Sequence, residues 1–276
     1  MSADLTYKGV FITGAAGGIG RVLVDAFLNV GATVIAADIN EAGLTDLEHA
    51  SSSDLLSVQV LDISDQPACA AAIATAGDVD ILINNGAVGM GVIRDDHLDN
   101  LVSMDEIGPD VWDRFVTTNL SGAWYLTRAV VPGMTARGWG RIITVTTSMF
   151  TMLRPMFHPY GPVKAGLEAM SAGHAGEFAD TGITVNVVVP GGPTDTPFVP
   201  AATKIDRAAM IRPAVMAPPM LWLCSEASDG VTGNRYIAAE WDPAASITEA
   251  RAAAEAPIGW PSLAGAPVWP GGTPDT

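Results

Sequence analysis

The chain has 276 residues, 49% of them apolar, a length that suits one large α/β domain or two small ones. Its 30 acidic residues against 14 basic ones give a net charge of −16, which argues against nucleic acid or an anionic membrane as a partner. Two isolated cysteines, no metal-ligand pattern, no signal-peptide pattern and no apolar run of the roughly 18 residues that a membrane span needs indicate a cytoplasmic protein without disulfides or metal.

Short apolar runs alternate with stretches of helical length along most of the chain. We predict strands at 9–13, 33–37, 56–61, 79–84, 141–147, 183–189 and 235–239. We predict helices at about 18–30, 41–50, 65–76, 110–137, 159–180 and 213–227. Several strands are apolar throughout, as parallel strands covered on both faces are. The pattern predicts a single-domain, Rossmann-type, doubly wound α/β fold with about seven parallel strands and helices on both faces.

The last part of the chain differs from the rest. Residues 1–240 hold the predicted domain, and residues 241–276 form a proline-rich extension that includes Trp260 and Trp269. Repeated prolines exclude long regular structure. We expect this extension to wrap a surface or to lack order, and not to be a separate domain.

Four glycines lie between the first predicted strand and the first predicted helix, in the stretch TGAAGGIG at residues 13–20. They let the backbone lie against a diphosphate at the helix N-terminus, where free N–H groups favour an anion. Asp38 ends the second predicted strand, where a carboxylate accepts hydrogen bonds from an adenosine ribose. Asp62 ends the third and is either an adenine contact or a helix cap. These residues predict a dinucleotide site.

Tyr160 and Lys164 are four residues apart in a predicted helix, so their side chains lie on one face. A nearby ammonium stabilises a phenolate, and we expect it to lower the pKa of the tyrosine. A tyrosine of lowered pKa is a usable acid or base near neutrality. The pair therefore predicts acid–base chemistry.

The order of these motifs resembles that of the single-domain short-chain dehydrogenase/reductase (SDR) family. The resemblance covers residues 7–240 and rests on the glycine stretch, Asn84-Asn85-Gly86-Ala87, Asn119, Tyr160-xxx-Lys164 and Pro190-Gly191. It implies that Tyr160 exchanges a proton with the substrate oxygen while hydride passes to or from a nicotinamide. It implies that Lys164 also holds the nicotinamide ribose and that Asn119 binds a water linking Lys164 to solvent.

The predicted cofactor is NAD. A carboxylate at Asp38 bonds the free ribose hydroxyls and repels the extra phosphate of NADP, and no basic residue stands at Ala15, Ala16 or Ile39. The predicted cofactor-binding residues are Gly14, Gly18, Ile19, Gly20, Asp38, Asp62, Ile63, Asn85, Gly86, Tyr160, Lys164, Pro190, Gly191, Thr194 and Thr196.

The chain departs from the family pattern at the position of the catalytic serine. That position, 13 residues before the tyrosine, holds Thr147, and Ser148 follows it. One step along a strand turns a side chain to the opposite face, so the two residues are not equivalent. We favour Thr147 as the donor to the substrate oxygen, and a local bulge would present Ser148 instead.

Two further motifs differ from the family pattern. Asn84-Asn85-Gly86-Ala87 replaces the usual Asn-Asn-Ala-Gly, which alters the turn at the adenine side. Pro193, in PGGPTDTP, has no N–H for the nicotinamide carboxamide, so Thr194 or Thr196 would supply a hydroxyl in its place. Residues 88–109 are longer than usual, and with the tail they are the candidates for shaping the pocket.

The predicted function is NAD-dependent interconversion of a secondary alcohol and a ketone. Catalysis would use Asn119, Thr147 or Ser148, Tyr160 and Lys164. The alternatives are a polyol or sugar dehydrogenase of the same family and a non-catalytic NAD-binding regulator. Apolar side chains favour an apolar or aromatic substrate unless they are helix core: Met149, Phe150, Met152, Phe157 and Phe198. The helices at 110–137 and 159–180 carry enough apolar residues to predict a homodimer or homotetramer.

Overall fold

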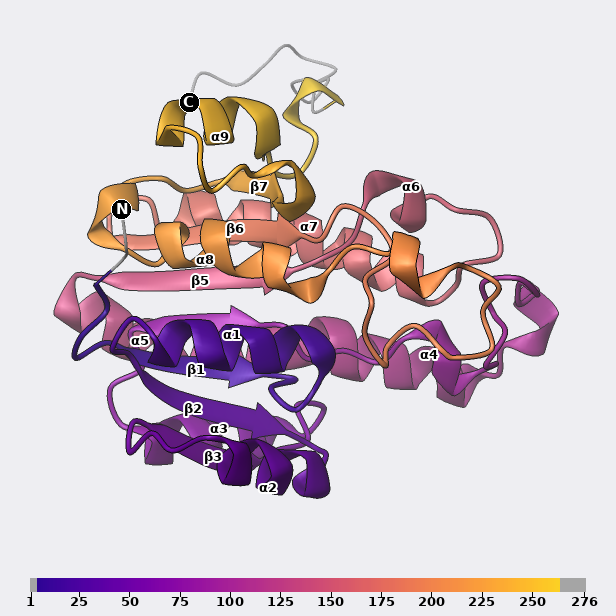
Figure 1. Cartoon of the computed structure of the whole chain (residues 1–276), viewed down its shortest axis with the longest axis horizontal. Helices are drawn as coiled ribbons and strands as arrows, with labels where there is room; N and C mark the ends of the chain where they lie inside the picture. Colours follow the sequence, from indigo (N-terminus) through magenta and orange to yellow (C-terminus); the bar gives the residue numbers. More distant parts are fainter. Residues whose placement is uncertain (1–3, 264–276) are drawn as a thin grey trace, which may run out of the picture.

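The seven predicted strands and one further strand form one sheet in the order β3-β2-β1-β4-β5-β6-β7-β8, in a computed structural model that describes residues 4–263 (Figure 1). Neighbouring strands are parallel except β7 and β8. The strand order reverses beside β1, which creates the crevice where ligands bind in such sheets. The strands are β1 (Gly9–Thr13), β2 (Thr33–Asp38), β3 (Leu56–Val60), β4 (Ile81–Asn84), β5 (Gly140–Val145), β6 (Ile183–Val189), β7 (Asn234–Ile237) and β8 (Glu255–Pro257).

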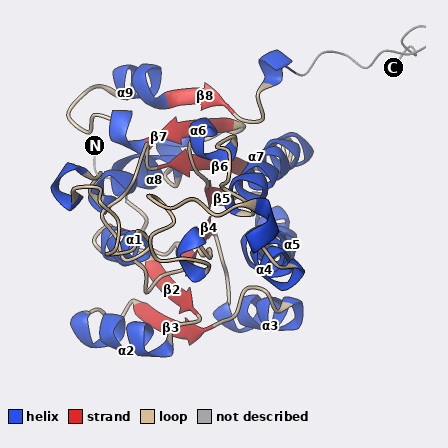
Figure 2. Cartoon of the chain, turned by 90° about the vertical axis from the view of Figure 1, so that its right-hand side faces the viewer, coloured by secondary structure: helices blue, strands red, loops and turns tan. Residues whose placement is uncertain are grey.

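Helices cover both faces of the sheet, as predicted. Figure 2 shows α1, α2 and α8 on one side of the strands and α3, α5 and α7 on the other. The helices are α1 (Gly18–Leu28), α2 (Glu41–Ala50), α3 (Gln66–Ala76), α4 (Pro109–Phe115), α5 (Gly122–Arg137), α6 (Met149–Met152), α7 (Tyr160–Glu177), α8 (Ala217–Leu223) and α9 (Ile247–Ala254).

The two cores follow from the alternation of side chains along fully buried strands. In β1, Val10 and Ile12 pack in the same cluster as Phe27 of α1. Phe11, between them, packs in the opposite cluster with Leu126 of α5. Successive side chains of a strand point to opposite faces, so an all-apolar strand serves two cores at once. This is why the apolar runs predicted a parallel sheet.

Side-chain caps set where the helices begin, and they exclude one of the two roles predicted for Asp62. Asp65, not Asp62, caps α3, with its carboxylate accepting the Ala68 N–H at 3.0 Å. Asp62 instead accepts the backbone N–H of Ser64 at 2.9 Å. It is therefore not the helix cap.

The C-terminal segment contains a helix and a strand that its many prolines had not led us to expect. Ser246 and Glu249 form a capping box that begins α9. The chain then pairs antiparallel with β7 as β8, with Glu255 opposite Tyr236. The sheet therefore has one strand more than the seven predicted. Part of the predicted extension, residues 264–276, lies outside the described residues.

The described helices include none that is long and apolar enough to cross a membrane. The longest, α7, has 18 residues and carries Lys164, Glu168 and Glu177 among them.

We predict that α9 contributes to the stability of the whole domain. Ala254 is 3% exposed and belongs to the same core cluster as Trp222 of α8 and Tyr236 of β7, whereas its neighbour Ala253 is exposed. Ala254→Glu places a carboxylate in that core and should lower the free energy of unfolding by more than about 2 kcal/mol. Ala253→Glu should change it by less than about 0.5 kcal/mol. Urea unfolding of both variants checks this, and equal effects would contradict the packing of α9.

Candidate active site

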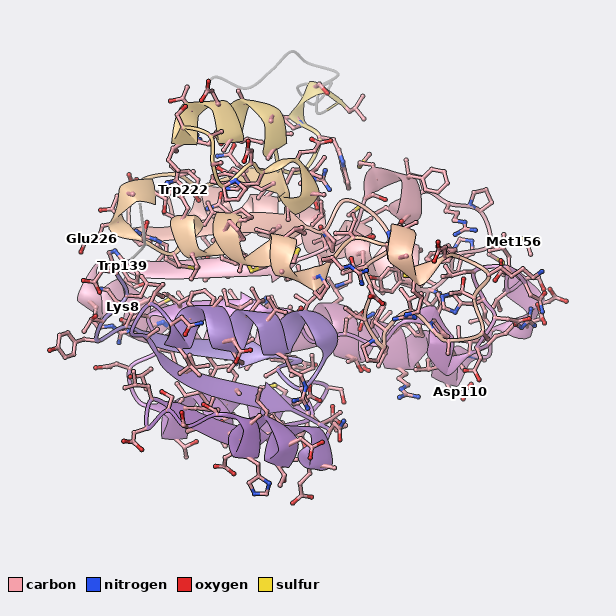
Figure 3. The ribbon with its side chains drawn as sticks, in the orientation of Figure 1. Lys8, Asp110, Trp139, Met156, Trp222 and Glu226 are labelled. Atoms are coloured by element: carbon pink, nitrogen blue, oxygen red, sulfur yellow. The ribbon has the colours of Figure 1, made fainter. Side chains whose placement is uncertain are left out.

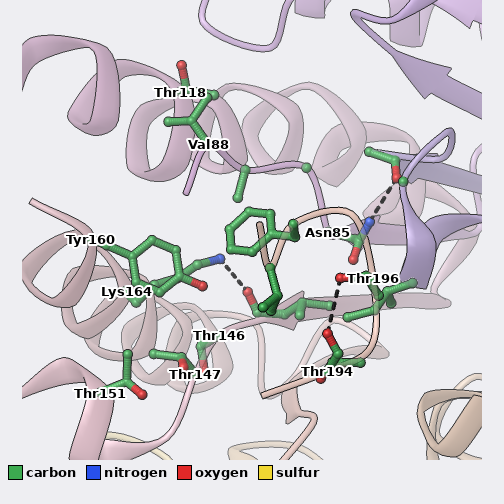
Figure 4. Close-up of a pocket in the computed structure, with 18 of the residues that line it drawn as sticks. Asn85, Val88, Thr118, Thr146, Thr147, Thr151, Tyr160, Lys164, Thr194 and Thr196 are labelled. Atoms are coloured by element: carbon green, nitrogen blue, oxygen red, sulfur yellow. Dashed lines mark hydrogen bonds between the residues drawn. The ribbon is translucent and has the colours of Figure 1, made fainter. Parts of the chain in front are cut away.

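A cavity of about 1180 Å³ extends along the carboxyl ends of the central strands (Figure 4). The glycine loop before α1 lines one end, and Phe157 and Tyr160 line the other. Of the predicted site residues, all but Asn119 line this cavity. Residues far apart in the sequence thus meet where the strand order reverses, as the predicted fold requires.

The glycine loop forms a cradle that side chains would fill. Gly14 has a φ of +64°, and a Cβ there would lie 2.8 Å from the Cα of Gly86. A Cβ on Gly20 would lie 2.1 Å from the Gly14 carbonyl oxygen. Gly17, which precedes α1, gives the helix no side-chain cap, so the N–H groups of the first turn stay available to an anion. The loop fits the diphosphate of a dinucleotide.

A cluster of hydrogen bonds joins the ends of β1 and β4. The buried Thr13 hydroxyl accepts the N–H groups of Asn85 at 3.1 Å and Gly86 at 2.9 Å. In return, the Asn85 amide donates to the carbonyls of Thr13 at 2.9 Å and Gly14 at 3.1 Å. Asn85 therefore holds the glycine loop in place, whatever it contacts in a ligand.

Asp38 is fixed beside the same loop. Its carboxylate accepts the N–H groups of Ala16 at 3.0 Å and Asn40 at 2.9 Å while lining the cavity. Arg21 is nearby in the sequence, but its guanidinium is bound to the carbonyls of Ala16 and Gly43 and does not line the cavity. The carboxylate thus faces the cavity without that cation beside it.

Tyr160 and Lys164 project from the first turns of α7 into the other half of the cavity (Figure 4). The Lys164 Nζ lies 5.8 Å from the centroid of the Tyr160 ring and donates a 2.8 Å hydrogen bond to the Val145 carbonyl. Burial raises the pKa of Tyr160 and lowers the pKa of Lys164 to about 8. The pKa of Tyr160 in the protein alone is therefore raised instead of lowered as expected, because burial disfavours the charged phenolate.

The end of β5 distinguishes Thr147 from Ser148. The strand stops at Val145, two residues before its predicted end, so both residues lie in the loop that follows. Ser148 is the N-cap of α6, and its hydroxyl accepts the Thr151 N–H at 3.2 Å and lies 3.0 Å from the Thr151 hydroxyl. Within residues 4–263 the Thr147 hydroxyl has no hydrogen-bond partner, and it lines the cavity. Thr147 is thus the one of the two with an available hydroxyl.

A buried ion pair fixes the backbone at this point. Glu168 of α7, 0% exposed, accepts the Arg235 Nε–H at 2.8 Å and the Thr146 hydroxyl at 2.9 Å. A second nitrogen of Arg235 donates to the carbonyl oxygen of Thr147 at 3.1 Å. The loop carrying Thr147 is therefore bound to both α7 and β7.

Asn119 lies in a π-helical turn, Val116–Ser121, that interrupts the predicted helix between α4 and α5. Its buried amide donates to the Val88 carbonyl at 2.9 Å and accepts the Val88 N–H at 2.7 Å. Both polar atoms of the side chain are therefore hydrogen-bonded to the backbone of the segment that follows β4. The π-turn and these bonds position the wall of the cavity, and the expected water link to Lys164 stays a prediction.

The loop after β6 closes over the cavity. Thr196 packs against the glycine loop, since a Cβ on Gly18 would lie 2.5 Å from its methyl carbon. Asp195 binds both Arg207 and Arg212, and Arg207 also donates to the Thr196 carbonyl at 3.0 Å. The Thr194 and Thr196 hydroxyls donate to carbonyls within this loop, at 3.2 and 3.4 Å. These bonds hold the loop against the dinucleotide end of the cavity.

Three matches with known proteins bear on this site. The sequence profile described as short chain dehydrogenase matches residues 8–205. The chain belongs to the short-chain dehydrogenase family. It is 34% identical over 187 residues to 3beta-hydroxysteroid dehydrogenase 2 of Eggerthella lenta, covering 65% of this chain and 68% of that protein. It is 32% identical over 248 residues to 2-keto-3-deoxy-L-fuconate dehydrogenase of Xanthomonas campestris pv. campestris, covering 83% of this chain and 78% of that one.

A solved structure agrees with the fold of this short-chain dehydrogenase. The present chain superposes on 3-ketoacyl-(acyl-carrier-protein) reductase of Brucella melitensis, solved in complex with NADH, with a TM-score of 0.72 and 25% sequence identity. The match covers 83% of this chain and 95% of the Brucella chain. The family of oxidoreductases and the doubly wound fold predicted from the sequence are both confirmed.

Several residues that build the site were missed by sequence reasoning. Glu168 and Arg235 were read only as parts of a helix and a strand, although an arginine inside a buried strand was a visible signal that a charged partner lies nearby. Thr13 was quoted in the glycine motif, but its role in joining β1 to β4 needs the tertiary fold. His97 and Leu98 line the cavity from the long segment at 88–109 that the sequence singled out.

We predict that the buried ion pair is costly to break. Arg235→Met leaves the Glu168 carboxylate buried without a cation and should lower the free energy of unfolding by about 3–5 kcal/mol. Arg212→Met, at a side chain 59% exposed whose partner Asp195 keeps Arg207, should cost less than about 1 kcal/mol. Thermal and urea unfolding of both variants measure this difference. A similar small loss in both would show that Arg235 does not hold the site together.

Proposed function

We propose that this short-chain dehydrogenase uses NAD(H) to interconvert a secondary alcohol and a ketone, with Tyr160 as acid and base. The observation that carries the proposal is one cavity joining a glycine cradle, a tyrosine–lysine pair and an available threonine hydroxyl. Its cysteines, Cys69 and Cys224, are buried and free, which suits the reducing cytoplasm as its compartment.

In the proposed oxidation, the carbinol carbon loses a hydride and its hydroxyl loses a proton. NAD, when bound, supplies the nicotinamide that accepts the hydride and becomes NADH. Tyr160, as phenolate, takes the hydroxyl proton, and Lys164, with its Nζ 5.8 Å from the centroid of the tyrosine ring, stabilises the phenolate. Thr147 donates a hydrogen bond to the substrate oxygen, whose negative charge is greatest in the transition state. The products are the ketone, NADH and one proton released from Tyr160 to solvent.

The names of two related enzymes point to different classes of substrate. The two relatives are named for a hydroxysteroid and for 2-keto-3-deoxy-L-fuconate, which differ in size and polarity. The second name favours a sugar-derived substrate as the alternative to an apolar alcohol. A non-catalytic NAD-binding regulator would have no need of the available Thr147 hydroxyl beside Tyr160. NADH formation across a panel of secondary alcohols tests the proposal, and no turnover in the native protein would reject it.

We predict a preference for NAD over NADP. The Asp38 carboxylate would accept hydrogen bonds from the ribose hydroxyls and repel a phosphate at the same place. Asp38→Asn should narrow the ratio of kcat/KM between the two cofactors by about tenfold, since one unpaired charge contact is worth roughly 1–2 kcal/mol. Asp62→Asn, which lines the cavity without fixing the glycine loop, is the matched control. A native enzyme that prefers NADP would contradict the assignment of Asp38 as the residue that selects NAD.

We predict that Thr147 supplies the hydroxyl to the substrate oxygen. Thr147→Val keeps the shape and removes the donor, and kcat/KM should fall roughly 10²–10³-fold, as for loss of an oxyanion donor. Thr147→Ser should retain activity, because the donor is kept. Ser148→Ala should be nearly silent in kcat/KM, because that hydroxyl is engaged in capping α6.

Two readouts complete this series. NAD affinity should change little in all three variants, because the hydroxyl faces the substrate. Tyr160→Phe removes the proton carrier and should abolish turnover while NAD still binds. An inactive Ser148→Ala enzyme beside an active Thr147→Val enzyme would overturn the assignment.

We also propose that the enzyme forms a homodimer or homotetramer through the face of α4, α5 and α7. Trp112 of α4 and Trp124 of α5 are 43% and 44% exposed, which is unusual for side chains of this size. Trp124→Glu should shift the protein toward monomer, and Tyr7→Glu, at a side chain 93% exposed elsewhere, should not. Light scattering at micromolar concentration measures the mass. A native protein that is only monomeric would contradict the proposal.

A further inference from the structure

A row of aromatic rings leads from Tyr160 toward one end of the cavity. The centroid of the Phe157 ring lies 6.0 Å from that of Tyr160, and the centroid of Phe198 lies 5.9 Å from it on another side. Phe150, Phe157 and Phe198 line the cavity, whereas Met149 and Met152 do not, so the apolar residues predicted near the substrate divide into lining and packing residues. The space beside Tyr160 therefore suits an apolar or aromatic group.

A guanidinium lies one ring beyond Tyr160. The Arg154 Cζ is 4.9 Å from the centroid of the Phe157 ring, and the residue is half-buried in the cavity wall. Contact with the ring face favours the cation but leaves its N–H donors available. Figure 3 shows that the neighbouring Met156 lies at the same end of the molecule as Asp110 of α4, and far from Lys8 and Trp139.

This guanidinium has no carboxylate partner in the part of the chain that the structure describes. Arg94, Arg207 and Arg212, by contrast, each bind a carboxylate. Three other arginines of the described residues form no ion pair, but Arg21 is bound to backbone carbonyls, and Arg114 and Arg128 are exposed. A cation held in a cavity wall with available donors is suited to bind a carboxylate from solution.

The side chains that lie near Arg154 do not neutralise its charge. His97, 5% exposed, lies with its ring centroid 6.0 Å from that of Phe157, and its Nδ1 is 3.1 Å from the Arg94 carbonyl. Burial lowers the pKa of His97, and the charge of Arg154 lowers it further, so the imidazole is neutral near pH 7. None of the four acids that line the cavity, Asp38, Asp62, Asp110 and Asp113, forms an ion pair with Arg154.

We propose that the substrate is an apolar or aromatic hydroxy acid, whose carboxylate binds Arg154 while its carbinol carbon lies at Tyr160. The Arg154 Cζ and the centroid of the Tyr160 ring lie 4.9 and 6.0 Å from the centroid of the Phe157 ring. A substrate with about one ring between its carboxylate and its carbinol carbon is therefore of a suitable length to reach both residues. The proposal rests on the function proposed above, and it makes Arg154 the residue that selects among alcohols.

A matched pair of substrates tests this. The alcohol 4-(1-hydroxyethyl)benzoate carries a carboxylate one ring away from its carbinol carbon, and 4-(1-hydroxyethyl)benzamide is its neutral counterpart of the same shape. The native enzyme should prefer the benzoate by about 10- to 100-fold in kcat/KM, the range of one charge-assisted contact. Arg154→Met should reduce this ratio to below about 3-fold, and Arg154→Lys should keep part of it.

Two controls locate the effect. Arg128→Met removes a cation that lies over Trp124 on α5 and does not line the cavity, and the ratio should not change. Arg114→Met removes the other arginine in the cavity wall. A native enzyme without preference for the benzoate, or a preference that is lost in Arg114→Met and kept in Arg154→Met, overturns the proposal.

A binding measurement separates this proposal from the proposed function. Calorimetry on the protein with saturating NADH gives the Kd of 4-acetylbenzoate and of 4-acetylbenzamide, without any need for turnover. If the benzoate binds more tightly than the benzamide and this difference depends on Arg154, the inference is supported, even if the enzyme oxidises no alcohol. Absence of alcohol oxidation would reject only the proposed function. Equal Kd values for the two ketones would reject the inference and leave the proposed function standing.

Discussion

The ion pair between Arg235 and Glu168 is the interaction on which the geometry of the candidate site depends. It is almost fully buried, and its two partners come from β7 and α7. Between them they bind the Thr146 hydroxyl and the Thr147 carbonyl, just beyond the end of β5. Buried charges are tolerated only where their geometry and hydrogen bonds are nearly complete. That requirement fixes the loop carrying Thr147 relative to the helix that carries Tyr160 and Lys164.

Burial also bears on why the proposed acid–base pair, Tyr160 and Lys164, would depend on a bound cofactor. Desolvation disfavours charge on either partner, raising the pKa of Tyr160 and lowering that of Lys164 to about 8. In the protein alone, the tyrosine is therefore a poor base. The oxidised nicotinamide ring is positively charged, and its arrival beside Tyr160 would favour the phenolate together with the Lys164 ammonium. Proton transfer would then be restricted to the complex in which hydride transfer is possible.

The fold was predictable because local and tertiary signals agree. Strands buried on both faces are apolar throughout, and β1 and β6 were predicted with their observed ends, Gly9–Thr13 and Ile183–Val189. The short strand β8 was missed because its sequence, Glu-Ala-Pro, has no strand-like pattern, and only pairing with β7 creates it. The π-turn at Asn119 was also hidden, since its side-chain bonds to Val88 cross 31 positions in the sequence.

The site was predictable where chemistry fixes residue type and spacing. Glycines that must approach a diphosphate and a tyrosine–lysine pair on one helix face are visible in the sequence. The choice between Thr147 and Ser148 was not, because it depends on where β5 stops and on which hydroxyl caps α6. The residues that hold this loop lie far along the chain: Glu168 is 22 positions from its partner Thr146, and Arg235 is 88 positions from its partner Thr147. Only the tertiary fold brings them together.

The central claim is that bound NAD turns Tyr160 into an acid or base that works near neutrality. The most direct test is a titration of phenolate absorbance in native protein and in Tyr160→Phe, each with and without saturating NAD⁺. The chain has four tyrosines, so the difference between the two proteins isolates Tyr160. The account predicts that this difference titrates above the ordinary value of about 10 without NAD⁺ and at about 8 or below with it. A titration that stays at the higher value in the presence of NAD⁺ would contradict it.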